Sequence, residues 1–220
     1  MQEKGMNMRT GKTLLVCLLF IVIACTGETG KDKQAIKQEL KKEYYPSGKL
    51  KIEFTLADGK YEGMYKTYYE NGKIMAEGNF KNGDKDGLWK EYSEDGIVID
   101  ESTYKNGLKE GCCKRYYKTG DLFAEFNYLH DKREGKSAWY YVSGRLKAEA
   151  YYKQDKEEGI RKTLFENGTL WKEENYKNGK KDGKNITYHE NGSIHYIDIY
   201  NDGKRMERES RDQKDNTTSK

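Results

Sequence analysis

The dominant pattern along the chain is a 24-residue alternation of apolar and polar positions. One aliphatic position recurs at each step: Leu50, Ile74, Val98, Leu122, Leu146, Leu170 and Ile194. An apolar or aromatic position follows six residues later: Leu56, Phe80, Tyr104, Tyr128, Tyr152, Tyr176 and Tyr200. Midway between them stand Glu53, Glu77, Glu101, Glu125, Glu149 and Glu173, with Ile197 in the last unit. Because successive side chains of a strand point to opposite faces, this spacing predicts a strand with apolar residues on one face and glutamates on the other.

A second segment in each unit also has strand composition. It carries Tyr68, Tyr92, Tyr116, Tyr140, Leu164 and Tyr188 at the same period. Two residues before four of these positions stand Lys66, Lys90, Lys114 and Lys162. Tyrosine, threonine and tryptophan favour strands, and lysines on neighbouring strands can pair with the glutamate row. We therefore expect each unit to be a β-hairpin whose charged side chains form a solvated face.

Glycines punctuate the units at fixed positions. The predicted repeat-turn glycines are Gly72, Gly87, Gly96, Gly111, Gly120, Gly135, Gly144, Gly159, Gly168 and Gly183. A third row keeps the same step, but Asp131 and Asp155 replace glycine in two units, and aspartate also tolerates left-handed turns. Glycine and Asn-Gly interrupt every candidate helix. The sequence predicts an all-β fold, an elongated single-layer antiparallel meander of about seven 24-residue hairpin repeats with roughly 13 strands.

The ends of the chain differ from this repeat region. Basic residues precede an apolar stretch from Thr13 to Ala24, which is the order of a secretory signal and too short to span a bilayer. The sequence predicts a signal peptide over residues 1–24, a polar tether over 25–42, the repeat domain over 43–203 and a charged disordered tail over 204–220.

Val22-Ile23-Ala24-Cys25 resembles a bacterial lipobox. The resemblance implies that Cys25 is lipidated and becomes the mature N-terminus, so that the protein is held on a membrane facing the periplasm or the exterior. The alternative is an ordinary signal peptide in which this cysteine is incidental. The flanking residues fit a secretory signal in either case, and lipidation of Cys25 would hold the repeat domain in the cell envelope.

Composition narrows the functional classes. Hydrophobic and charged residues each make up 35% of the chain, which predicts a thin fold, while 19 Tyr, 3 Trp and 6 Phe are too many aromatics for a disordered chain. Basic and acidic residues alternate along the whole chain and leave a net charge of only +4, so the sequence does not indicate a nucleic-acid-binding protein.

Residues that could carry chemistry are few. His189 and His195 flank one predicted turn but lack a third ligand, and adjacent Cys112 and Cys113 should point to opposite faces. No phosphate-binding loop or nucleophile elbow is present. We expect no enzyme activity, no metal, no cofactor and no small-molecule substrate.

Aromatic side chains are the candidate contacts. The predicted binding face consists of Tyr68, Tyr92, Tyr116, Tyr140, Tyr188, Trp89 and Trp139. Exposed aromatics can anchor a protein partner, and the alternative is that they only cover the sheet.

The pattern N-G-x-[LIV]-x-x-E-x-x-[YF]-x-N-G-x-x-[DE]-G, as in Asn71 to Gly87 and Asn167 to Gly183, resembles the bacterial MORN repeat variant. The similarity covers Tyr44 to Gly203 and extends to YwqK-type proteins. It implies a curved single-layer sheet that serves as an interaction scaffold for an unidentified protein. The alternative it implies is an antitoxin or immunity protein that covers the active surface of a toxin.

Lipidation of Cys25 is testable in the producing cell. Cys25→Ser is expected to abolish incorporation of radiolabelled palmitate, because the thiol that would carry the lipid is lost. Cys17→Ser, within the predicted leader, is the matched control and should label normally. Labelling that persists in Cys25→Ser would exclude the anchor.

Overall fold

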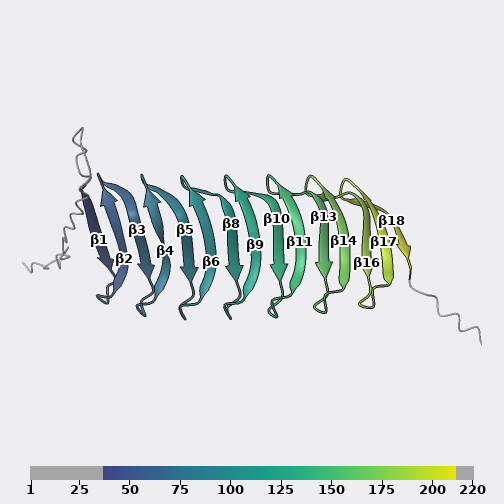
Figure 1. Ribbon diagram of the computed structural model, residues 1–220, viewed down its shortest axis with the longest axis horizontal. Coiled ribbons are helices and arrows are strands. Elements are labelled where there is room, and N and C mark those ends of the chain that lie inside the picture. The colour runs from purple at the N-terminus through teal and green to yellow at the C-terminus, as the bar shows by residue number, and fades with distance from the viewer. Residues whose placement is uncertain (1–36, 212–220) are drawn as a thin grey trace, which may run out of the picture.

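The computed structural model describes residues 37–211, which form one open antiparallel sheet of eighteen strands (Figure 1). The strands follow one another in chain order along the long axis of the molecule. No helix occurs in this part of the chain, and hence none that could cross a membrane. The all-β, single-layer meander predicted from the repeat is confirmed.

The first strands are β1 (Gln38–Tyr44), β2 (Leu50–Ala57), β3 (Lys60–Tyr68), β4 (Ile74–Lys81), β5 (Asp84–Tyr92) and β6 (Val98–Lys105). The middle strands are β7 (Leu108–Lys109), β8 (Gly111–Tyr116), β9 (Leu122–Leu129), β10 (Lys132–Tyr140), β11 (Leu146–Lys153) and β12 (Lys156–Glu157). The last are β13 (Gly159–Leu164), β14 (Leu170–Lys177), β15 (Lys180–Lys181), β16 (Gly183–Tyr188), β17 (Ile194–Asn201) and β18 (Lys204–Ser210).

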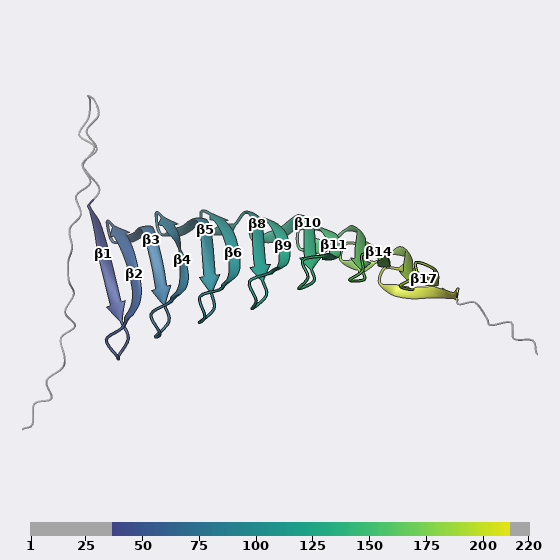
Figure 2. The same cartoon turned by 60° about the horizontal axis from the view of Figure 1, so that its bottom comes forward.

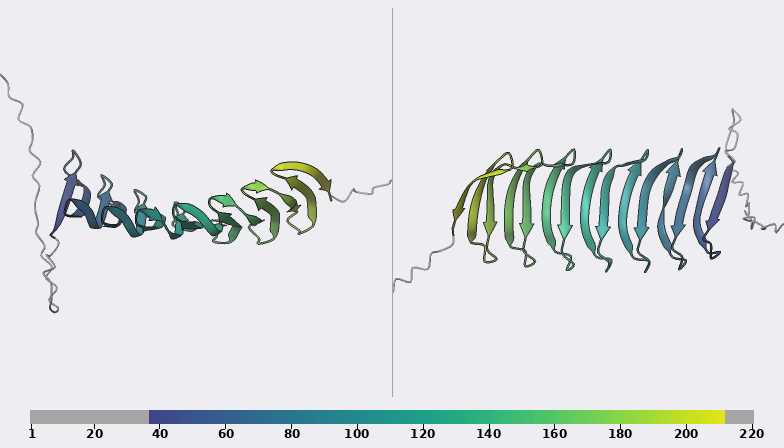
Figure 3. Two further views of the ribbon diagram at one scale, coloured as in Figure 1. Left: turned by 90° about the horizontal axis from the view of Figure 1, so that it is seen from above. Right: turned by 180° about the vertical axis from the view of Figure 1, so that it is seen from behind.

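The sheet is twisted along its length. In Figure 2 the strands near β1 and the strand β17 at the other end run in clearly different directions. The views from above and from behind show one layer of curved strands throughout (Figure 3). Twist of this kind follows from the right-handed twist of each strand.

One set of hairpin turns has positive φ at both central residues, as a type I′ turn requires. Asn82 and Gly83 have φ of 53° and 94°. Asp131 and Asp155 occupy the glycine position with φ of 65° and 66°, which confirms that aspartate replaces glycine here. The Oδ1 atom of Asp131 also accepts the Lys109 N–H at 2.7 Å, a bond that glycine cannot make.

The other set of turns closes a longer loop around a single left-handed glycine. Gly72 has φ of 87° and donates its N–H to the Tyr69 carbonyl at 2.9 Å. The Tyr69 hydroxyl donates to the Tyr92 carbonyl at 2.6 Å in the next unit. The same tie between units is made by Tyr45 to Tyr68, Tyr117 to Tyr140 and Tyr141 to Leu164. These turns are therefore stacked as well as closed.

Five of the ten predicted turn glycines lie at bulges instead of turns: Gly87, Gly111, Gly135, Gly159 and Gly183. Gly87 has φ of 75° inside β5, where two extra residues face the step from Glu77 to Asn79 on β4. The acidic residue before the bulge glycine caps the next hairpin: Glu62 accepts the Asn82 N–H at 2.6 Å, and Glu158 accepts the Asn178 N–H at 2.8 Å. The Asp/Glu-Gly motif is thus a capped bulge, which redirects the strand without ending it.

The sheet extends beyond the predicted repeat domain at both ends. β1 begins at Gln38, so the tether prediction is wrong for residues 38–42, and β18 makes the tail prediction wrong for 204–210. β18 is held by pairing with β17 and by Arg208, whose guanidinium contacts Asp198 at 2.7 and 2.8 Å. These end strands, and bulges that split β7 from β8, β12 from β13 and β15 from β16, also explain why about 13 strands was too few.

Packing in a single layer depends on neighbouring strands. Trp89 is 5% exposed and lies over Gly78 of β4, where an added Cβ would sit 2.3 Å from the indole. Its Nε1–H donates to the Asn79 carbonyl at 3.0 Å. Gly78 therefore provides the space that the tryptophan ring fills.

Gly78→Ala is expected to lower the free energy of unfolding by about 1–3 kcal/mol, because the new methyl overlaps the indole. In a Trp89→Ala background the same change should be neutral or stabilising by about 0.4–1 kcal/mol, since alanine restricts the unfolded chain. Urea unfolding of the parent, the two single variants and the double variant gives the free-energy change caused by Gly78→Ala in each background. Equal costs in the two backgrounds would contradict the packing described.

Candidate interaction surfaces

One face of the sheet carries a ladder of alternating lysine and glutamate, called here the ladder face. Its directly paired positions are Lys42, Glu53, Lys66, Glu77, Lys90, Glu101, Lys114 and Glu125. Lys66 Nζ lies 3.2 Å from Glu77, and Lys90 Nζ lies 2.9 Å from Glu101. The predicted cross-strand pairing of these residues is confirmed.

The tyrosine row shares the ladder face. Tyr92 and Tyr116 donate their hydroxyls to Glu77 and Glu101 at 2.6 and 2.8 Å. Tyr68 donates to Glu53 and Tyr140 to Glu125 in the same way. Burial, and then the bond to the carboxylate, raise the pKa of both Tyr92 and Tyr116 to about 12. These hydroxyls are therefore hydrogen-bonded to ladder glutamates.

The carboxylates of the ladder are stabilised in their charged form. The Tyr92 hydroxyl is the largest cause that lowers the pKa of Glu77, with Lys66 adding to it. For Glu101 the Lys90 ammonium is the largest cause that lowers the pKa, followed by the Tyr116 hydroxyl. Each glutamate therefore has a lysine and a tyrosine as partners in one plane of the sheet.

The opposite face, called here the ring face, carries a continuous aromatic cluster. Trp89 is adjacent to Lys90 in β5 and so points away from the ladder face. Its ring lies 5.6 Å from Tyr65, 5.1 Å from Phe80 and 6.3 Å from Tyr104, measured between centroids. Tyr61 stacks on Phe80 at 4.9 Å and is 38% exposed. The cluster spans β2 to β6 without a covering layer among the described residues.

Cations alternate with the rings along one margin of the ring face. Lys85 Nζ lies 4.1 Å from the Trp89 ring and 5.0 Å from the Tyr104 ring. Lys109 lies between the Tyr104 and Tyr128 rings, at 5.9 and 5.5 Å. Arg133 lies 4.1 Å from the Tyr152 ring. Ring faces attract these cations, and the charges remain part of the surface.

The predicted binding face is wrong as a single surface. Trp89 and Trp139 lie on the ring face, where Trp139 contacts Phe126 at 5.7 Å, whereas Tyr68, Tyr92, Tyr116 and Tyr140 lie on the ladder face. Trp89 and Tyr92 are three residues apart in β5, and Trp139 and Tyr140 are adjacent in β10, so strand alternation itself places them on opposite faces. Leu146 was expected on the face opposite the glutamates, but it lines a hollow together with Glu125. The cause is a one-residue skip in the β10–β11 register, where Trp139 pairs with Ala148 and Tyr140 with Leu146.

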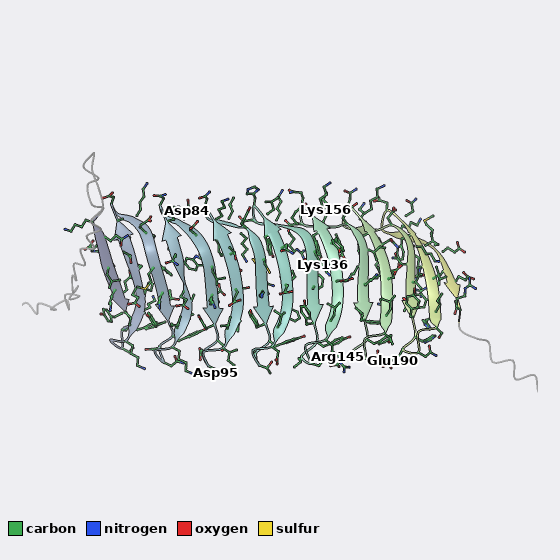
Figure 4. All side chains as sticks on the ribbon, viewed as in Figure 1. Asp84, Asp95, Lys136, Arg145, Lys156 and Glu190 are labelled. Atoms are coloured by element: carbon green, nitrogen blue, oxygen red, sulfur yellow. The ribbon has the colours of Figure 1, made fainter. Side chains whose placement is uncertain are left out.

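The fifth unit breaks the ladder. Ala138 of β10 stands between Glu125 and Glu149, at the position where four other units have lysine and the last has Ile186. Lys136, near the middle of the sheet in Figure 4, lies 2.8 Å from Glu149. A hollow of about 350 Å³ opens beside Ala138, and it is lined by Cys112, Glu125, Asn127, Lys136, Tyr140 and Leu146 as well.

Towards β18 the ring face becomes polar. Arg208 and Asp198 form a bidentate pair, which is the main reason why the pKa of Asp198 is lowered. Lys181 lies 2.5 Å from Glu174. Burial raises the pKa of Glu157 despite nearby Arg161. The two ends of the ring face therefore offer different chemistry.

The histidines and cysteines considered as possible metal ligands do not form a metal site among the described residues. His189 and His195 meet across their turn, with Nε2 and Nδ1 2.9 Å apart. Among residues 37–211, no three His, Cys, Asp or Glu side chains are grouped to hold a metal. Cys112 is exposed and Cys113 is buried, on opposite faces. Cys25 lies outside the described residues.

The comparisons identify the family. The family described as "MORN repeat variant" matches residues 40–58, 61–82, 85–106, 109–130, 157–178 and 181–202, more than half of the chain. The chain therefore belongs to this family, whose repeats are generally non-catalytic scaffolds for interaction with proteins or membranes. No curated protein matches the chain. The hairpin β10–β11, with Ala138, falls in the unmatched stretch between 130 and 157.

Ladder carboxylates predict a specific acid response. Since the pKa values of Glu77 and Glu101 are lowered in the folded state, their stabilisation is present above the unfolded pKa of about 4.3 and is lost as the pH falls through the folded values. Each should contribute about 0.5–1 kcal/mol. Urea unfolding between pH 7 and 3 should show a flatter decline for the double variant Glu77→Gln/Glu101→Gln. The control Glu207→Gln, on exposed β18, should keep the parent slope, and a double variant with the parent slope would refute the assignment.

Proposed function

We propose that this MORN-repeat chain is a lipid-anchored interaction scaffold of the cell envelope, and that its ring face docks an acidic surface of a protein partner. The observation that carries the proposal is the aromatic cluster of β2 to β6, which lies on one face of a single-layer sheet and is bordered by Lys85 and Lys109. Large rings that are partly exposed are the side chains that contribute most to protein–protein binding.

Charge favours an acidic partner. Lys85, Lys109 and Arg133 lie in one row with the rings, and each already rests on a tyrosine or tryptophan face. Burial lowers the pKa of Lys85, and a partner carboxylate would favour its charged form. Acidic side chains could therefore pair with this row while apolar groups cover the rings.

The anchor is the second part of the proposal. β1, which follows the lipobox-like segment in sequence, is at one end of the elongated sheet (Figure 1). A lipid on Cys25 would tether the sheet through that end and leave both broad faces accessible to a partner. This arrangement suits a scaffold at a membrane surface.

The similarity to YwqK-type proteins adds a second candidate function, toxin neutralisation. In that case the ring face would cover the active surface of a toxin, and the contact chemistry would be the same. The broad, uncovered ring face supports both candidates. The identity of the partner decides between them.

The proposal is tested by cross-linking in intact cells, with partners identified by mass spectrometry. Tyr104→Ala removes a ring-face side chain between Lys85 and Lys109 and should reduce recovery of the partner at least tenfold. Tyr116→Phe, which only removes a ladder-face hydroxyl, is the matched control and should keep recovery.

Both variants should retain the far-UV circular dichroism spectrum of the parent chain, so that a loss of binding is not a loss of folding. Recovery of no partner above background would refute the scaffold role. Equal recovery with Tyr104→Ala would move the contact away from the ring face.

A further inference from the structure

The ladder face has one vacant rung. In most units a lysine stands between two glutamates, as Lys66 stands between Glu53 and Glu77. In the fifth unit both glutamates are kept, at Glu125 and Glu149, but the residue between them is Ala138. The methyl group of alanine leaves the volume of a lysine side chain unfilled.

The vacancy coincides with a hollow. Ala138 lies in the hollow of about 350 Å³ on this face, with Leu146 as an aliphatic wall and with Glu125 and Asn127 as polar walls. Ala138 is 7% exposed, and Lys136 and Tyr140 of the same strand line the hollow beside it.

Charge is only partly rebalanced by the protein itself. Lys136 reaches Glu149 at 2.8 Å and so replaces the missing partner on that side. Glu125 has its other lysine, Lys114, at 3.7 Å, the longest of the ladder ion pairs, and receives the Tyr140 hydroxyl at 2.9 Å. At Glu77 and Glu101 the lysine of the following strand, Lys90 or Lys114, also helps to lower the pKa through its charge, whereas the residue at that position beside Glu125 is Ala138.

We propose that this hollow binds a lysine or arginine side chain presented by a protein, which completes the ladder between Glu125 and Glu149. The aliphatic stem of the incoming residue packs on Ala138 and Leu146, and its cationic head pairs with Glu125. Long basic side chains bury their stems in this way while the charge stays at a polar rim. The repeat supplies the template, because Lys66 and Lys90 occupy the same position within the chain.

This site is separate from the docking surface proposed above. The hollow is on the ladder face, whereas Trp89 and Tyr104 are on the ring face. Four of its lining residues, Lys136, Ala138, Tyr140 and Leu146, lie in the stretch that the family does not match. Binding at the hollow can therefore be measured whether or not a ring-face partner is recovered.

The test is a nuclear magnetic resonance titration of the full chain with N-acetyl-lysine methylamide at constant ionic strength. Saturable shifts confined to Ala138, Tyr140 and Leu146 are expected. The neutral isostere N-acetyl-norleucine methylamide should bind at least fivefold more weakly, because it lacks the charge that pairs with Glu125. Equal binding of the two compounds, or no saturable shift with either, would overturn the proposal.

Two variants examine the template. Ala138→Lys fills the vacancy from within and should abolish the response, whereas Lys90→Ala should open a second vacancy between Glu77 and Glu101 that responds to the same compound. A response that persists in Ala138→Lys would place binding elsewhere. A response in Lys90→Ala without one in the parent chain would mean that Lys136 already closes the hollow, and would also overturn the proposal.

Discussion

The constraint on which this structure depends is that its described part is a single layer. With no helix or second sheet to pack against, a side chain can be buried only by neighbours on the same face of the sheet. The Trp89 ring of β5 packs against Tyr65 of β3 and Phe80 of β4 on the same face, and it fills the space left over Gly78 of β4. Stability is therefore built from lateral contacts, which explains why the same residue types must recur at a fixed step.

The lateral contacts differ in chemistry between the two faces. On the ladder face, tyrosine hydroxyls and lysine ammonium groups converge on each glutamate, as at Glu77, so that polar groups stay paired close to water. On the ring face, aromatic side chains overlap from strand to strand and hold cations such as Lys85 at their edges. Either face can change in one unit without disturbing distant units, because the ring contacts and hydroxyl bonds described above reach no further than the adjacent unit.

That independence is visible where the repeat varies. The fifth unit loses its ladder lysine at Ala138 and gains Lys136 two residues earlier, which still pairs with Glu149. In the last units the central ring-face positions become Asp198 and Arg208, and the ion pair between them helps to hold β18 on the sheet. A scaffold of this kind can therefore acquire local binding features while its architecture is maintained by the other repeats.

The sequence alone determined the architecture. Residues every 24 positions must be equivalent in a repeat, and glycine, or aspartate at Asp131, marks the positions where φ is positive. It also determined the pairing of Lys66 with Glu77, because both positions follow from the strand period. Only the tertiary structure decided that Leu146 lies on the ladder face, because the one-residue skip opposite Trp139 and Tyr140 reverses the alternation before Glu149. The bulge at Gly87 adds two residues and so keeps the alternation. It likewise decided that β18 joins the sheet, because its strand conformation comes from pairing with β17 and has no signal in the repeat pattern. β1 has such a signal, since Lys42 and Tyr44 stand 24 residues before Lys66 and Tyr68.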